Sequence, residues 1–124
     1  MTAKITLLLA AANGLLAVIL GAFGAHGLKN TISAKLMSAF ETAVQYHFYH
    51  TFALLVIALL LLQTGSKPSL QISASLFLAG IVLFCGSLYA LALGGPAWLG
   101  PITPIGGLAF IGGWASLLWF AIKS

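Results

Sequence analysis

The residues able to do chemistry in this chain are gathered in one segment. All three histidines, His26, His47 and His50, lie between positions 26 and 50, and the only acidic residue, Glu41, lies among them. Imidazole and carboxylate groups can carry protons, and imidazole is also a common metal ligand. We therefore expect any polar site of this protein to be built from this segment.

Helical projection spreads the polar groups of residues 41–50 over about two thirds of a helix circumference. With the histidine of the preceding segment, the candidate polar cluster comprises His26, Glu41, Gln45, Tyr46, His47, Tyr49 and His50. One interpretation is a belt of aromatic and histidine side chains at the membrane interface. The other is a site in which His26 faces His47 or His50 across a helical hairpin, with Glu41 close enough to hold one of them charged.

The composition requires the elements that position these residues to lie in a membrane. Hydrophobic residues make up 61% of the chain and charged residues 5%, and the mean hydropathy is +1.13. Such a chain has too little polar surface to cover a water-soluble globule. We predict a single transmembrane domain over residues 1–124, with the lipid bilayer as its first partner.

Charged residues and turn residues divide the chain into four apolar segments. Residues 5–28 and 42–66 are uncharged stretches bracketed by charged residues, and each is long enough for the ~20 residues that span a bilayer. The longer stretch 68–122 is interrupted by glycine and proline between Gly94 and Pro104. The runs are continuously apolar and do not alternate as barrel strands do. The predicted spans are about 5–27, 43–63, 71–93 and 104–122, which gives an all-α four-helix bundle.

The segment from Leu28 to Phe40 is more polar than the spans on either side. Ile32, Leu36 and Phe40 repeat at i, i+4 and i+8 within it. This spacing predicts a short amphipathic interfacial helix after the first span, capped by Thr31 or Ser33, that leads into the second span. A plain polar loop is the alternative.

Small residues recur along the first and last spans. In the first, with gaps of 4, 3, 4 and 3, they are Ala10, Gly14, Ala17, Gly21 and Gly24, and in the last they are Gly106, Ala109 and Gly113. Small side chains at this period let helix backbones approach closely in a membrane. We predict helix packing along both seams, and we expect Asn13 to bond to a neighbouring helix, with ligand contact as the alternative.

The lysines predict the orientation of the chain in the membrane. With four spans, Lys4, Lys67 and Lys123 share a side with both termini, and Lys29 and Lys35 lie on the other side. The excess of three over two predicts that both termini are cytoplasmic. The chain has no arginine and no basic cluster, so no nucleic-acid partner is expected.

Several separated motifs together resemble a known family. They are Gly-Ala-Phe-Gly-Ala-His-Gly-Leu at 21–28, Tyr46 and His50 with the residues between them, Phe-Cys-Gly-Ser-Leu-Tyr at 84–89, and Leu-Gly-Pro-Ile-Thr-Pro-Ile-Gly-Gly at 99–107. The sequence is similar to the small membrane proteins called domain of unknown function 423, whose relatives include transmembrane protein 256. The resemblance implies a four-helix, multi-pass protein of the bacterial inner membrane. It brings no established reaction, substrate or cofactor.

Three classes of function fit these observations. The first is a non-enzymatic membrane component that packs against copies of itself or against other membrane proteins. The second is a small oligomeric transporter or ion-coupled carrier that uses the Glu41 and histidine cluster. The third is a metal-binding or haem-binding membrane protein, with His47 and His50 at i, i+3 and His26 as a further ligand.

The first class agrees best with the shortage of catalytic side chains. The chain has no set of nucleophile, base and acid, no phosphate-binding glycine loop in a strand context, and a single cysteine, Cys85. We therefore expect no enzymatic activity and no cofactor, and we expect a homo-oligomer or a complex with other membrane proteins.

Overall fold

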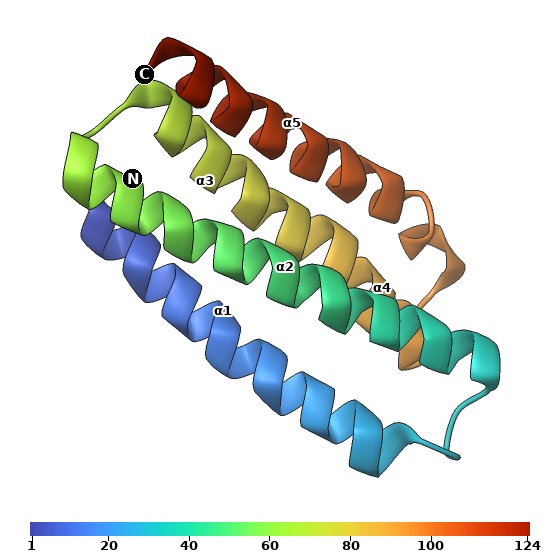
Figure 1. The fold of residues 1–124 in the computed structure, drawn as a ribbon. Coiled ribbons are helices and arrows are strands. Elements are labelled where there is room, and N and C mark those ends of the chain that lie inside the picture. Colours follow the sequence, from blue (N-terminus) through green and yellow to red (C-terminus); the bar gives the residue numbers. More distant parts are fainter.

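The computed structural model describes residues 1–124, and helices and turns account for all of its regular structure (Figure 1). In chain order the elements are α1 (Ala3–Phe23), the π-helical turn η1 (Gly24–Leu28), α2 (Ala34–Thr64), α3 (Pro68–Gly80), the π-helical turn η2 (Ile81–Cys85), α4 (Gly86–Ala92), the short 3₁₀ turn η3 (Ala97–Leu99) and α5 (Ile102–Lys123). Four segments are long and apolar enough to cross a membrane: Ala3–Leu28, Ala34–Thr64, Pro68–Ala92 and Ala97–Lys123. The predicted all-α fold with four spans is confirmed.

The predicted polar helix that leads into the second span is confirmed, with Ser33 and not Thr31 as its cap, and it is continuous with that span. The chain turns after Leu28, and Ser33 caps α2 by accepting a hydrogen bond from the Leu36 N–H at 3.2 Å. Thr31 instead donates to the Gly27 carbonyl at the end of η1. Because residues 34–42 contain no glycine or proline, the helix continues without a break into the second span. With 31 residues, α2 is about 46 Å long, so the polar segment forms its first turns beyond the ~30 Å hydrocarbon core.

The helix α2 lies at the centre of the molecule. In Figure 1, α1 and α5 lie at opposite edges, and α2 with the α3–α4 segment lies between them. The helix α1 packs on α2, and α5 packs on α3 and η2. The buried core is accordingly supplied by α2 and the third span, including Leu54, Ile57, Leu70 and Phe77.

The small residues of the first span lie against α2. Ala10 and Ala17 are fully buried, and a Cβ added to Gly14 or Gly21 would lie 3.5 Å from Thr51 or Val44, respectively. Gly24 lies against the ring of Phe40. These contacts allow the two helix backbones to approach along the length of α1.

The small residues of the last span lie against the third. The backbone of Gly106 touches the backbone of Phe84 in η2, and Gly113 lies against the ring of Phe77. The Ser73 hydroxyl donates to the Gly113 carbonyl at 2.7 Å. Ala109, between the two glycines, is half-buried. The segment η2 keeps α3 and α4 in one continuous span while placing Phe84 where α5 approaches most closely.

Candidate functional site

The two histidines in the middle of α2 are buried, and His47 joins three helices. It is 1% exposed, and its Nε2 lies 2.9 Å from the Asn13 Oδ1 of α1. The Asn13 amide donates to the Leu9 carbonyl at 2.8 Å, which fixes its oxygen toward the imidazole. His47 therefore carries its proton on Nε2, and its Nδ1 accepts from the Tyr89 hydroxyl of α4 at 2.9 Å. The predicted bond from Asn13 to a neighbouring helix is confirmed.

His50 faces the other edge of the molecule and contacts α5. It is 4% exposed, and its Nδ1–H donates to the Tyr46 carbonyl at 2.7 Å. Its Nε2 accepts from the Trp114 indole N–H at 3.1 Å. The imidazole also stacks on Phe110, with ring centroids 3.6 Å apart and planes 10° apart. Both ring nitrogens are thus occupied, as they are in His47.

The other members of the candidate cluster lie on the surface. His26 is exposed in η1, and Glu41, Gln45 and Tyr49 are exposed on α2. Tyr46 is 38% exposed, and its ring lies 4.7 Å from that of Phe84. The structure therefore divides the seven residues into two buried histidines and a set of exposed groups.

Of the two interpretations of this segment, the one that pairs His26 and Glu41 with the α2 histidines is wrong. Glu41 and His50 are nine residues apart, about two and a half helical turns, and so lie on opposite faces of α2. The ring nitrogens of both buried histidines already bond to Asn13, Tyr89, Trp114 and the Tyr46 carbonyl. No three histidine, cysteine, aspartate or glutamate side chains lie close enough together to hold a metal ion.

Besides Asn13, three aromatic partners of the buried histidines lie outside the predicted cluster. Tyr89 binds His47, and Trp114 and Phe110 contact His50. The sequence indicates that Tyr89 and Trp114 need hydrogen-bond partners. The Tyr89 hydroxyl and the Trp114 N–H lie in apolar spans, where a buried polar group needs a partner. Assigning each of these residues to a particular histidine requires its depth in the membrane, and that depth depends on where the helices begin and end.

An aromatic groove lies beside His50 between α2 and α5. It has a volume of about 530 Å³ and is lined by Tyr46, Tyr49, His50, Phe84 and Trp114, among others. Because Trp114 and the Tyr46 carbonyl occupy the imidazole nitrogens, His50 offers no free lone pair to this groove. The arrangement is suited to holding helices together through hydrogen bonds and stacked rings.

Comparison with known proteins gives a consistent result. The family model described as "Protein of unknown function (DUF423)" matches residues 20–107. A Bacillus subtilis protein named UPF0382 membrane protein YwdK is 47% identical over 120 residues, which cover 97% of this chain and 98% of the relative. A Haemophilus influenzae UPF0382 membrane protein is 44% identical, with 95% and 94% covered. The Escherichia coli UPF0382 inner membrane protein YgdD is 42% identical, with 99% and 93% covered.

No solved structure matches this chain. Its arrangement of helices and buried histidines therefore has to be interpreted from its own contacts.

Proposed function

This chain belongs to the DUF423 family of membrane proteins of unknown function, and on that premise we propose that it is a non-enzymatic packing and interaction component of the membrane. Its buried polar groups serve to fix four helices in one arrangement. The outer faces of its two edge helices serve to contact other membrane proteins, with a second copy of this chain as the first candidate.

One observation carries this proposal: every ring nitrogen of the two buried histidines bonds to a protein group. His47 connects α2 to Asn13 of α1 and to Tyr89 of α4, and His50 connects α2 to Trp114 of α5. A histidine that ligates a metal or relays a proton needs a lone pair or a proton free for that task. Here those positions are used for contacts between helices, so we assign both residues a structural role.

The edge helices support the proposal of a partner. The outward residues of α1 and α5 are large and apolar, for example Leu15 and Val18 on α1 and Leu108 and Leu118 on α5. Neither edge helix is covered on its outer side by another element of the chain. These faces can pack against lipid or against the same faces of a second copy. We place the protein in the inner (plasma) membrane, with both termini in the cytoplasm.

The proposal is tested by separating a structural role of the histidines from a chemical one. Replacing His47 or His50 by leucine should lower the unfolding temperature of the purified protein, because each change leaves a buried partner unbonded. The same replacement at exposed His26 is the matched control and should leave the unfolding temperature unchanged.

Two measurements would contradict the proposal. One is a stoichiometric metal in the purified wild-type protein that is lost in the His47 or His50 variant. The other is a proton flux in reconstituted vesicles that the Glu41→Gln variant abolishes, which would favour a carrier. Cross-linking between copies in native membranes should yield a discrete dimer or trimer, and a chain that stays monomeric there would remove the self-association part of the proposal.

A further inference from the structure

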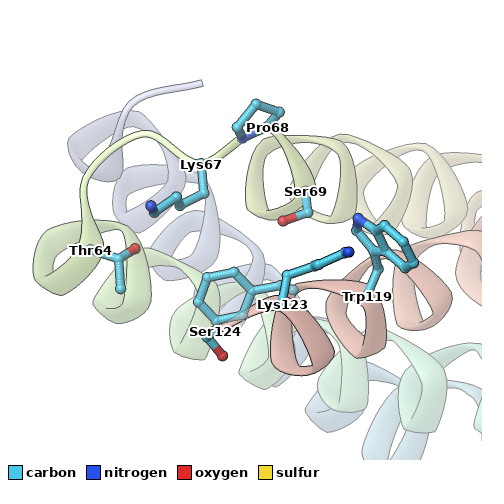
Figure 2. Close-up of a pocket in the computed structure, with 8 residues that line it drawn as sticks. Thr64, Lys67, Pro68, Ser69, Trp119, Lys123 and Ser124 are labelled. Carbon is cyan, nitrogen blue, oxygen red and sulfur yellow. The ribbon is translucent and has the colours of Figure 1, made fainter.

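A pocket flanked by two lysines opens at the end of the molecule that carries both chain termini (Figure 2). It has a volume of about 420 Å³. Thr64 at the end of α2, Lys67 and Ser69 at the start of α3, and Trp119 and Lys123 near the end of α5 all line it. Because three of the apolar spans begin or end here, we expect the pocket to lie at the level of the lipid headgroups.

No acidic side chain lines this pocket. Glu41, the only one in the sequence, lies near the other end of α2, 23 residues or about 35 Å from Thr64. In Figure 2, Lys67 extends toward Thr64 and Lys123 extends toward Trp119, with Ser69 between them in this view. The Lys123 ammonium lies 4.8 Å from the centre of the Trp119 ring. An anion bound between the two lysines would be attracted by both ammonium groups.

Ser69, which lines the same pocket as the two lysines, adds uncharged hydrogen-bond donors. Its hydroxyl makes no hydrogen bond within the protein, and no side chain caps the start of α3. The Ser69 backbone N–H is accordingly one of the unpaired donors of the first helical turn. The Ser116 hydroxyl of α5 donates to the Ser69 carbonyl at 2.7 Å and holds this residue in place. A phosphate oxygen at this position would meet two donors and the positive end of a helix.

We propose that this pocket binds the phosphate of an anionic phospholipid headgroup, such as that of phosphatidylglycerol. The ammonium groups of Lys67 and Lys123 flank the phosphate, and Ser69 donates to one of its oxygens. A lipid is favoured over a free phosphate ion because Trp119 and Phe120 form an apolar wall beside the charged groups. Trp119 is 55% exposed, and tryptophan is typical of the interface between headgroups and hydrocarbon.

The experiment is a lipid titration of the whole protein in an uncharged detergent, followed by native mass spectrometry. Phosphatidylglycerol is compared with phosphatidylcholine, whose headgroup carries no net charge. The test variant is Lys67→Gln with Lys123→Gln, and the control is Lys29→Gln with Lys35→Gln, which removes the same charge at the other end of the molecule. We expect the test variant to bind phosphatidylglycerol about twentyfold more weakly than the wild type, and each single variant about fivefold more weakly. The control should bind as the wild type does.

Further measurements test the role of Ser69 and distinguish a bound phospholipid from a free phosphate ion. Ser69→Ala should weaken binding about threefold while leaving both lysines in place. Inorganic phosphate in large excess over the lipid should not displace it. The α-carboxylate of a chain that ends at Ser124 lies at the pocket rim and repels an anion. A variant with a short Gly-Ser extension moves this carboxylate away, and it should bind the lipid at least as tightly as the wild type does.

The proposal would be overturned by any of three results. The first is unchanged binding by the Lys67 and Lys123 double variant. The second is an equal loss in the Lys29 and Lys35 control, which would indicate attraction to net charge alone. The third is displacement of the lipid by inorganic phosphate together with equal binding of phosphatidylcholine, which would assign the pocket to a free anion. All variants are compared at matched helical content, and the single lysine variants decide the question if the double variant does not fold.

Discussion

At the scale of single residues, His47 and His50 hold opposite neutral tautomers. The Tyr46 carbonyl can only accept and the Trp114 indole can only donate, so His50 must carry its proton on Nδ1. The Asn13 oxygen, fixed by the Leu9 carbonyl, places the proton of His47 on Nε2. We expect ¹⁵N spectra of histidine-labelled protein to show one buried ring of each tautomer. Two rings of the same tautomer would show that one of these hydrogen bonds is not formed.

The bond between His47 and Tyr89 should contribute measurably to stability. Tyr89→Phe removes the hydroxyl that donates to His47 and leaves the ring in place. We expect it to lower the free energy of unfolding by about 1 kcal/mol, within the range found for hydrogen bonds between membrane helices. A double-mutant cycle with His47→Leu should give a coupling energy of about 0.5–1.5 kcal/mol. Tyr49→Phe, at an exposed tyrosine of α2, is the control and should change stability little.

The sequence identified the residues of the polar segment but not their grouping. Burial of His47 and His50 depends on which faces of α2 meet the neighbouring helices, and helical projection gives only relative angles. The projection spreads the polar groups over most of the circumference, so it does not separate those on different faces, and nine residues place Glu41 opposite His50 on the helix. Asn13 was correctly expected to bond across helices, because an amide within an apolar span needs a partner.

At the scale of elements, the contact between Gly106 and Phe84 sets how closely α5 approaches the third span. A Cβ at Gly106 would overlap the backbone of Phe84, which cannot move without shifting η2. We expect Gly106→Ala to lower the free energy of unfolding by about 1–3 kcal/mol, the usual cost of overpacking. The measurement is unfolding of the purified protein in mixed micelles.

The neighbouring glycine provides a matched control. A Cβ at Gly107 would lie 3.9 Å from the Phe84 ring, an ordinary contact. Gly107→Ala adds the same methyl group to the same helix turn and should be nearly neutral. Equal destabilisation by both variants would mean that glycine is needed here for a reason other than the approach of α5 to Phe84.

The four spans could be predicted because uncharged stretches of bilayer length leave little choice of structure. Their ends could not be predicted in the same way. The predicted cap Ser33 does start α2 at Ala34, but the predicted second span begins only at residue 43 because the first turns of this helix are polar. The π-helical turns η1 and η2 arise within apolar helical sequence. They reflect packing between helices, such as that of Gly106 on Phe84, which no single segment encodes.

At the scale of the whole molecule, the two ends differ in their charged groups. The end with the termini carries Lys4, Lys67 and Lys123 and no acidic side chain. The other end carries Lys29 and Lys35 together with Glu41. This difference agrees with the proposed orientation and with the proposed lipid site, since the anionic lipids of a cytoplasmic leaflet attract juxtamembrane lysines. Both proposals therefore require the Lys67 pocket to open on the cytoplasmic side of the membrane.

Orientation can be measured with cysteines placed in the two types of turn. In a Cys85→Ala background, Ser66→Cys lies in the turn between α2 and α3, and Ala97→Cys lies in η3 at the other end. Both positions are exposed, so each thiol is accessible from its own side of the membrane. We expect an impermeant maleimide to label Ala97→Cys in intact spheroplasts and Ser66→Cys only after lysis. The opposite pattern would place the Lys67 pocket in the outer leaflet, and the lysine excess would then have failed to set the topology of this chain.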